Sequence, residues 1–231
     1  MSTKSKHKIA ILQSNYIPWM GYFDIIRSVD TFIIYDCVQY TKSDWRNRNQ
    51  ILMNGKKNWL TIPVNFSNKH QLINETQVPS SNWAQKHYKS IRQFYQKAPF
   101  FHLFEKDIEK LYIQANELVY LSEINKLFIT YICSILEINT KIVWNYTPIK
   151  TDNPNERLIN TCHEFEATNY LTGPSAKNYL DTFKFNSNKI TVDWFDYPNY
   201  QHYNQLKTSA FIPNLSIFDT LFNTGSCLFT K

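Results

Sequence analysis

The chain opens with two short apolar runs that are separated by a stretch with helical spacing. Residues 9–12 and 31–35 are continuous apolar runs, of the kind found in buried parallel strands. Between them, residues 20–28 place their apolar side chains on one helical face. A strand, a helix and a second strand in this order form a βαβ unit. We therefore expect parallel strands whose following loops meet at one edge of a sheet.

The next part of the chain changes from a polar loop to a predicted hairpin. Residues 37–50 are polar and rich in aromatic side chains, which is typical of a loop. Asn54-Gly55 is a strong turn signal between two strand-like stretches. Residues 51–64 are therefore expected to form a β-hairpin.

Helical periodicity then dominates, and it predicts an inserted helical block over residues 82–137. Its helices are expected to begin at Asn82, at Pro99 and near residue 117. Residues 140–231 are expected to return as strands over 141–144, 169–171 and 190–197, with helices over 153–165 and 215–222. This order predicts an α/β protein, a single domain of residues 1–231 with a mostly parallel, Rossmann-like sheet.

Composition supports a folded domain and removes several classes of site. Hydrophobic residues make up 43% of the 231 positions and charged residues 19%, so the chain can bury a core. Only 4 glycines are present, and no glycine-rich phosphate motif occurs. The net charge of +6 has two explanations, an anionic partner or the Lys-rich composition that an AT-rich coding sequence produces.

The cysteines and the N-terminus indicate a cytoplasmic protein. Cys37, Cys133, Cys162 and Cys227 lie too far apart in sequence for a metal-binding pair, so we expect reduced thiols and no metal site. The apolar run near the N-terminus is too short for a signal peptide. No apolar run is long enough to span a membrane. The sequence indicates no particular cofactor.

Candidate chemistry begins where the first predicted strand ends. Gln13, Asn15, Tyr16, Trp19 and Gly21 follow that strand and open the first helix, where open α/β sheets bind ligands. The free N–H groups of a helix start favour a phosphate or another anion. An ordinary tight turn, with the indole covering the core, is the alternative.

The loop after the second predicted strand is the stronger candidate. It begins at Asp36 and alternates aromatic, acidic, basic and amide side chains: Tyr40, Asp44, Trp45, Arg46, Arg48 and Asn49. The planar guanidinium group of arginine suits phosphate or carboxylate groups. A solvated loop with incidental charges is the alternative, and a patch that binds RNA would use the same residue types.

Two further segments carry candidate side chains. His87 lies on the apolar face of its predicted helix, where it is either a core histidine or a general base. Gly173 and Ser175 lie between a predicted strand and a predicted helix, with Ser175 expected to cap that helix. They form either a second anion or sugar subsite or a simple capped connection.

Specific motifs are spread along nearly the whole chain. They are Ile11-Leu-Gln-Ser-Asn-Tyr-Ile-Pro-Trp-Met-Gly-Tyr-Phe23, Asp36-Cys-Val-Gln-Tyr40, Asp44-Trp-Arg-Asn-Arg-Asn49, Trp59-Leu-Thr-Ile-Pro-Val64, Tyr170-Leu-Thr-Gly-Pro-Ser175 and Leu215-Ser-Ile-Phe-Asp-Thr-Leu-Phe-Asn223. Through them the chain resembles the WbqC-like protein family. The resemblance implies a place beside the enzymes of bacterial surface-polysaccharide (O-antigen, lipopolysaccharide) biosynthesis that modify nucleotide-linked sugars. Cys37 stands where members commonly have a second acid after Asp36, which argues against paired carboxylates there.

The opening βαβ unit is also similar to that of the nucleotidyltransferase and class I synthetase superfamily. In that superfamily the first turn carries a Gly-His pair, whose histidine stabilises a phosphoryl transition state. Tyr22 stands at that position here. The similarity therefore implies the fold rather than adenylyl transfer.

Two hypotheses of function follow. In the first, the chain is a transferase that acylates or aminoacylates the amine of a nucleotide-linked sugar. The aromatic side chains would stack on sugar and base, and the two arginines would hold the pyrophosphate or another phosphate-bearing group. His87 or Asp36 would accept the amine proton, and Asn15 or Asn49 would stabilise the oxyanion. The donor would be an acyl or aminoacyl compound, charged transfer RNA included.

The second hypothesis is a binding module without turnover, for RNA or for a partner in polysaccharide assembly. The two hypotheses differ in the expected shape of the site. A closed pocket favours a small-molecule substrate, whereas a long basic groove favours nucleic acid.

Overall fold

The computed structural model describes residues 6–226, and these residues form two compact units. The first unit contains the chain up to Gln13, together with Gly21–Cys37 and Asn139–Asn199. The second contains Ser14–Met20, Val38–Ile138 and the chain from Tyr200 onward. The predicted helical block therefore lies in the second unit, and the segment predicted to return over residues 140–231 is shared between the units.

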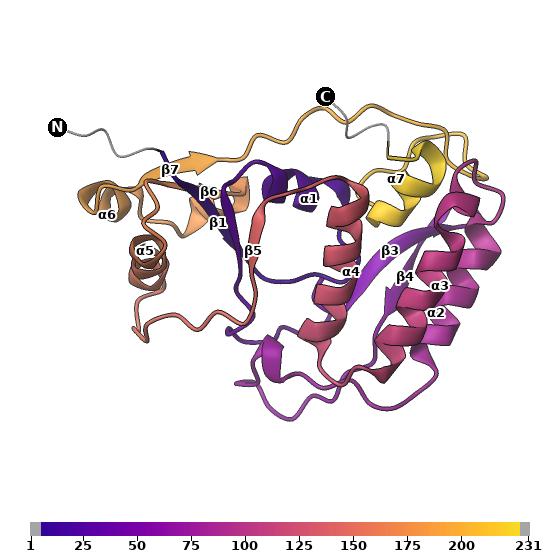
Figure 1. Ribbon diagram of the computed structural model, residues 1–231, viewed down its shortest axis with the longest axis horizontal. Helices are drawn as coiled ribbons and strands as arrows, with labels where there is room; N and C mark the ends of the chain where they lie inside the picture. Colours follow the sequence, from indigo (N-terminus) through magenta and orange to yellow (C-terminus); the bar gives the residue numbers. More distant parts are fainter. Residues whose placement is uncertain (1–5, 227–231) are drawn as a thin grey trace. The chain divides into compact units, whose positions relative to one another are not determined.

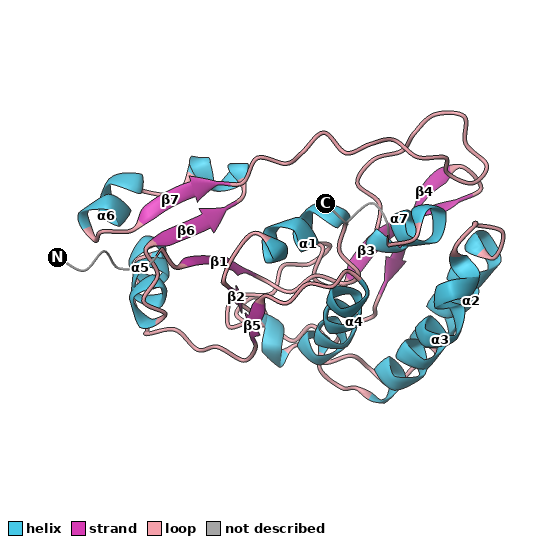
Figure 2. Ribbon diagram, turned by 45° about the horizontal axis from the view of Figure 1, so that its top comes forward, coloured by secondary structure: helices cyan, strands magenta, loops and turns pink. Residues whose placement is uncertain are grey.

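The first unit is built on a five-stranded sheet in which every paired strand is parallel (Figures 1 and 2). In spatial order the strands are β5 (Lys141–Val143), β2 (Thr31–Ile34), β1 (Lys8–Leu12), β6 (Asn169–Thr172) and β7 (Thr191–Trp194). Counted within the sheet this is the order 3-2-1-4-5 of the Rossmann type. The predicted α/β fold with a mostly parallel sheet is confirmed.

The central strands explain the continuous apolar runs in the sequence. Each residue of β2 is buried, and β1 buries its three middle residues. A strand that is covered on both faces has no polar alternation. Tyr170 of β6 stacks on Phe185 at 5.5 Å, which attaches the small helix α6 (Thr182–Ser187) to the sheet.

Two longer helices complete the first unit, α1 (Met20–Arg27) and α5 (Pro154–Glu164). Helix α5 begins as predicted, because the Asn153 side chain accepts hydrogen bonds from the N–H groups of Asn155 and Glu156, and Pro154 occupies the first turn. The predicted cap at Ser175 is wrong. Ser175 is exposed inside the short 3₁₀ helix Pro174–Asn178, which has no side-chain cap and begins after Gly173.

The second unit contains the predicted hairpin and four helices. Strands β3 (Arg48–Met53) and β4 (Lys56–Thr61) are antiparallel and are joined by Asn54 and Gly55, both with positive φ. The helices are α2 (Trp83–Tyr95), α3 (Phe101–Glu117), α4 (Leu121–Ile135) and α7 (Ile217–Thr224), with α2 and α3 side by side (Figures 1 and 2). Helix α4 begins later than predicted, because the backbone at Leu118 and Tyr120 is extended.

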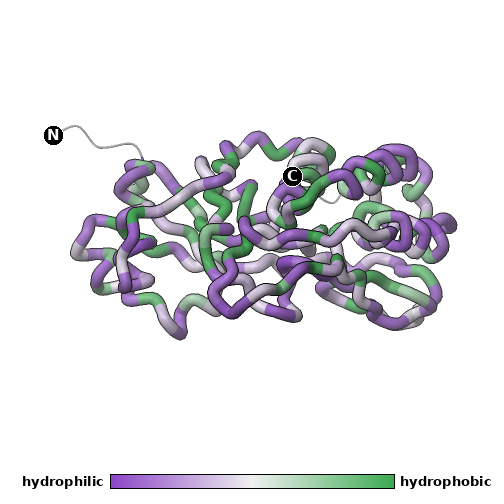
Figure 3. Tube along the Cα trace, turned by 90° about the horizontal axis from the view of Figure 1, so that it is seen from below, coloured by the Kyte–Doolittle hydropathy of each residue, from purple (hydrophilic) through white to green (hydrophobic). Residues whose placement is uncertain are grey.

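Hydropathy varies over short distances along the whole trace, with hydrophobic stretches repeatedly broken by hydrophilic residues (Figure 3). Within residues 6–226, none of the helices has the length and apolar character needed to cross a membrane. Cys227 of the cysteine analysis lies outside the described residues, as does most of the basic N-terminus.

Candidate functional site

The loop after β1, residues 14–20, is fixed in the second unit by contacts to its backbone. The N–H of Tyr16 donates to the Trp45 carbonyl at 3.0 Å. Asn49 Nδ2 donates to the carbonyl oxygens of Tyr16 and Ile17 at 3.1 and 2.9 Å, and Ser216 Oγ donates to Ile17 at 2.9 Å. Ile17 has a φ of 38°, a strained value for a β-branched residue. The loop therefore keeps a conformation that its own sequence disfavours.

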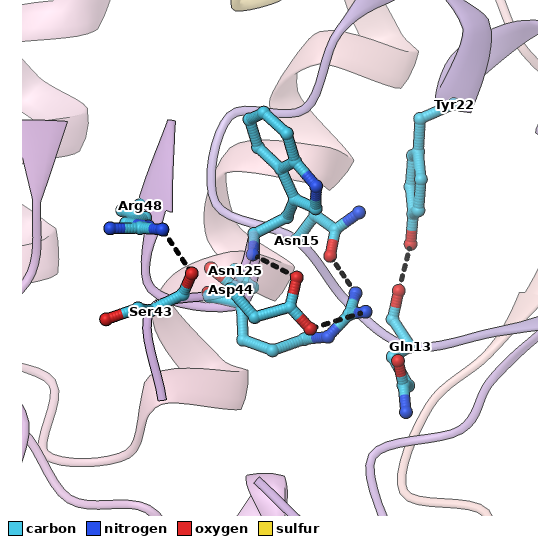
Figure 4. Close-up of polar contacts among 9 residues, drawn as sticks. Gln13, Asn15, Tyr22, Ser43, Asp44, Arg48 and Asn125 are labelled. Atoms are coloured by element: carbon cyan, nitrogen blue, oxygen red, sulfur yellow. Dashed lines mark hydrogen bonds and ion pairs between the residues drawn. The ribbon is translucent and has the colours of Figure 1, made fainter. Parts of the chain in front are cut away.

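Arg46 joins this loop to the loop after β2. Its guanidinium group donates to Asn15 Oδ1 and contacts Asp44 Oδ2 at 3.4 Å, so Asn15 and Asp44 have dashed contacts to one guanidinium group in Figure 4. Asn125 of α4 adds a second connection, because its Nδ2 donates to Ser14 Oγ and to the Arg46 carbonyl, each at 2.9 Å. Arg46 is 15% exposed at its side chain and already has polar partners. Its first role is to hold the two loops together.

The two loops, with Asn49 of β3 and Asn214, line an open cavity of about 210 Å³, which we call the indole pocket. It is lined by Asn15, Pro18, Trp19, Trp45, Asn49 and Asn214. None of these lining side chains carries a charge. Trp19 contacts the ring of Tyr200 and Trp45 contacts Trp59, with ring centroids 5.6 and 5.3 Å apart. The pocket thus offers indole surface and carboxamide groups, which suit an uncharged ligand with hydroxyl or amide groups.

Arg48 lies beside the pocket rather than in its lining. Its guanidinium carbon stacks over the Trp59 ring at 4.0 Å, and its Nη2 donates to the Ser43 carbonyl (Figure 4). These contacts attach residues 43–48 to the hairpin. The structure gives Arg48 this supporting role, and its contact with a phosphate group stays a prediction.

Four predicted site residues are buried in the second unit. Tyr16 is fully buried, and its hydroxyl group contacts His87 Nδ1 at 2.8 Å and the Tyr112 hydroxyl at 2.6 Å. Tyr40 is buried against Phe66. Asn49 is 2% exposed and directs its amide at backbone carbonyls.

His87 is the fourth, and it occupies the environment of a core histidine. Its ring is 7% exposed and packs on Trp83 and Tyr16. Burial lowers the pKa of His87 from 6.5 to about 4, while a backbone contact at Thr61 opposes the change. A general base must reach its substrate. The buried ring has no such access within the second unit, so we assign it no catalytic role.

The other predicted residues lie in the first unit. Gln13 follows β1 and its carbonyl accepts from the Tyr22 hydroxyl at 3.0 Å, as Figure 4 shows. Gly173 follows β6, the neighbour of β1 at the point where the strand order reverses, which is the ligand-binding position of open α/β sheets. Asp36 is buried at the end of β2, and Gly21 is buried in the first turn of α1. These residues belong to the first unit, whereas the indole pocket belongs to the second.

The surroundings of Cys37, at the end of β2, do not favour a cysteine nucleophile. Burial raises the pKa of the Cys37 thiol, and the nearby Asp36 raises it further, whereas the Arg157 guanidinium group lowers it. Burial also raises the pKa of Tyr35 to about 12. Both groups therefore stay protonated near neutral pH.

Replacing Gly173 by Ala tests whether a ligand approaches the first unit. Gly173 has a φ of −72°, and a Cβ atom there would lie 3.6 Å from the Tyr197 hydroxyl, which is an ordinary contact. We expect the variant to fold with a free energy of unfolding equal to or about 0.4–1 kcal/mol above that of the parent. Chemical denaturation measures this. Normal stability with a lost ligand response would place a ligand against Gly173, and a destabilised variant would contradict the expectation.

One wall of the pocket, which comes from residues 200–214, was not predicted from the sequence. Asn214 lines the pocket, and it belongs to residues 200–214, which we call the strap. Asn214 has a φ of 61°, and it is exposed. The Pro213-Asn214 pair is a turn signal in the sequence, but nothing local relates it to Asn15 or Trp45.

The fold and site define an α/β protein with a parallel sheet in one unit and an uncharged aromatic and carboxamide pocket in a mainly helical second unit. The chain belongs to the WbqC-like protein family, whose model matches residues 13–228. It is also 43% identical over 222 residues to an uncharacterized protein of Mycobacterium tuberculosis, Rv1507c, across 95% of this chain and 94% of that protein. No solved structure matches the chain. The similarity to the nucleotidyltransferase superfamily therefore stays a prediction.

Proposed function

We propose that the protein is a transferase that modifies a nucleotide-linked amino sugar for bacterial surface polysaccharide, and that the indole pocket holds the sugar ring. The composition of the pocket carries this proposal. Indole faces pack on the C–H groups of a sugar ring, and carboxamides both donate to and accept from its hydroxyl groups. Trp19 and Trp45 supply the indole faces, and Asn15 and Asn214 supply the carboxamide groups.

The size of the pocket restricts which part of the ligand it holds. Sites for drug-sized ligands have volumes of about 300–1,000 Å³, whereas the indole pocket has about 210 Å³. One sugar ring suits this volume, and the nucleotide then lies outside it. Because no lining side chain is charged, a bare ammonium group inside the pocket would have no counter-ion. We therefore expect the bound ring to be neutral in the pocket, with the reacting amine at the mouth.

The proposed reaction is acyl or aminoacyl transfer to that amine. The nitrogen attacks the acyl carbon of an ester or thioester donor, and a C–N bond forms while the bond to the leaving oxygen or sulfur breaks. The proton lost by nitrogen passes to the leaving group. Within residues 14–20 and 38–47 of the second unit, Asp44 is the acidic residue, and its half-buried carboxylate lies beside Arg46, so we assign it the transient proton.

A binding module without turnover is the second candidate, and one observation favours it. The residues that line the indole pocket include no titratable side chain. Such a pocket can select a sugar without changing it. The small, uncharged pocket favours a small molecule over RNA in both candidates.

Ligand binding separates these proposals from an empty cavity. We expect uridine diphosphate N-acetylglucosamine to raise the melting temperature, with a stabilisation of about 2.7 kcal/mol at 100 times its dissociation constant. Trp45→Leu should reduce this response at least about tenfold in affinity, since it removes one stacking face. Tyr120→Leu is the matched control, because Tyr120 is 39% exposed, like Trp45 at 42%, and does not line the pocket. Equal responses to uridine diphosphate alone would contradict the proposal.

Transfer is measured next, on the same protein. The protein is incubated with a uridine diphosphate-linked sugar that has a free amine and with an acyl thioester. A mass increase of one acyl group on the sugar supports the transferase, and binding without any transfer for a panel of donors supports the binding module.

A further inference from the structure

The strap is attached to the rest of the second unit by a buried carboxylate. Asp219, in the first turn of α7, is fully buried. Its Oδ2 accepts from the Tyr203 hydroxyl at 2.8 Å and from Gln205 Nε2 at 2.7 Å, both in the strap. Its Oδ1 accepts from the Tyr95 hydroxyl at 2.8 Å. One carboxylate thus joins the strap to α2 and α7.

Gln205 also closes the strap on itself. Its Nε2 donates to the Ile212 carbonyl at 3.0 Å, and its Oε1 accepts from the Ile212 N–H at 2.8 Å. The amide group is therefore bonded to Asp219 on one side and to both backbone groups of Ile212 on the other. The side-chain amide of Gln205 therefore fixes the position of the Ile212 backbone.

Asn214 lies between two attached positions of the chain, Ile212, which is held by Gln205, and Ser216. Ser216 donates its N–H to the Gln50 carbonyl at 2.8 Å and its hydroxyl to the Ile17 carbonyl at 2.9 Å. Asn214 itself has left-handed backbone, which asparagine tolerates better than most residues. Such a conformation persists where the surroundings over-determine it. Within residues 6–226 its carboxamide has no hydrogen-bonding partner, and the residue lines the indole pocket.

We propose that Asn214 is the specificity-determining residue of the indole pocket, and that Gln205, through Asp219, is the positioning residue that holds it there. The ligand class it selects is a sugar with an amide substituent, because a carboxamide can donate to and accept from another amide at once. This inference rests on the proposed function. Its two parts have separate tests, one with ligand and one without.

The positioning part is tested without ligand, by Gln205→Glu. This change preserves the shape of the side chain but places a second carboxylate beside Asp219 and removes the donor to Ile212. We expect hydrogen exchange of the Ile212 amide to become at least about tenfold faster. The double variant Gln205→Glu with Asp219→Asn exchanges the amide and the carboxylate, so that the amide introduced at position 219 can donate to the new carboxylate. Exchange protection should then return in part, because the Ile212 N–H keeps an acceptor at position 205 while the Ile212 carbonyl still lacks its donor.

The specificity part is tested with Asn214→Gly. Glycine adopts positive φ without strain, so the strap keeps its conformation and the Ile212 amide its protection. Affinity for uridine diphosphate N-acetylglucosamine should fall about tenfold, and affinity for uridine diphosphate glucose, which lacks the amide, should change less. If Asn214 had only a structural role, the ratio of the two affinities, for the N-acetylglucosamine compound over the glucose compound, would not change. Gln205→Glu should lower the same ratio, and the double variant should restore it.

Each part has an outcome that overturns it. Unchanged Ile212 exchange in Gln205→Glu, or no recovery in the double variant, removes Gln205 as the positioning residue. An unchanged affinity ratio in Asn214→Gly removes Asn214 as the specificity determinant while leaving the proposed function in place. If the parent protein binds no nucleotide-linked sugar, the proposed function and the role of Asn214 both fail, and the exchange measurements still decide the role of Gln205.

Discussion

Replacing Asn49 by Ala is expected to lower the free energy of unfolding by about 2–4 kcal/mol and to abolish ligand binding in the indole pocket. The side chain is buried, and it makes two hydrogen bonds to the strained loop at Tyr16 and Ile17 and one to the Gln50 N–H. Without it, buried carbonyl groups lose their donor, and the left-handed backbone at Ile17 loses a support. Chemical denaturation and titration with the nucleotide-linked sugar measure the two effects.

Asn58→Ala is the matched control on the same hairpin. Asn58 Nδ2 donates to the Lys56 carbonyl at 3.0 Å in a solvent-exposed setting, so its removal should change the free energy of unfolding by less than about 1 kcal/mol. Asn49→Asp should be worse than Asn49→Ala, because it directs a carboxylate oxygen at two carbonyl oxygens. Full stability of Asn49→Ala with loss of binding would instead show that Asn49 contacts the ligand directly.

Acidification from pH 6.5 to pH 4 should remove about 3 kcal/mol of stability through His87 alone. Burial lowers the pKa of His87 from 6.5 to about 4. Between pH 6.5 and pH 4 the unfolded chain therefore binds a proton at His87 that the folded chain does not bind. The contribution is therefore complete above about pH 6.5 and is lost as the pH falls towards 4. The free energy of unfolding, measured at several pH values across this range, gives the slope of stability against pH.

The contribution of His87 is isolated by two glutamine variants. His87→Gln removes the titrating group, so its stability should vary less with pH than that of the parent protein. His102→Gln, at an exposed position of α3, is the control for the replacement of a histidine by glutamine. Equal slopes in the parent protein and in His87→Gln would mean that the ring is not held neutral by burial.

The sheet and the hairpin were predictable because their signals are local. The apolar runs that form β1 and β2 are buried on both faces. A strand of this kind has a continuous apolar sequence without alternating polar residues. The Asn54-Gly55 turn specifies a hairpin through its backbone preferences alone. Helix α6 was missed because it has six residues, one of which, Phe183, is 78% exposed and breaks the expected amphipathic pattern.

The candidate site was predictable only as a region. The loops that carry Asn15 and Trp45 meet in one pocket, and parallel neighbouring strands make that meeting expected. Whether an individual amide faces a ligand or a backbone carbonyl depends on its surroundings, and Asn49 and Asn15 are indistinguishable in sequence. Tyr16 and His87 have the same ambiguity, because the residue types that bind ligands also form buried polar contacts.

Asn214 and Asp219 show where sequence reasoning ends. Both act through contacts with residues that are far away along the chain, Asn214 with the pocket and Asp219 with Tyr95. No spacing rule connects such positions. Only the tertiary structure reveals that the strap belongs to the pocket.

The attachment of Ser216 to Ile17 spans 199 positions of the chain, and this has a consequence for synthesis on the ribosome. The loop after β1 is synthesised long before Ser216, which supports Ile17, and long before Asn214 and helix α7. Contacts of such long sequence separation form late and slowly. A nascent chain that stops before residue 200 therefore has every strand of the parallel sheet but lacks the Asn214 wall of the indole pocket, which is completed only when the strap has left the ribosomal exit tunnel.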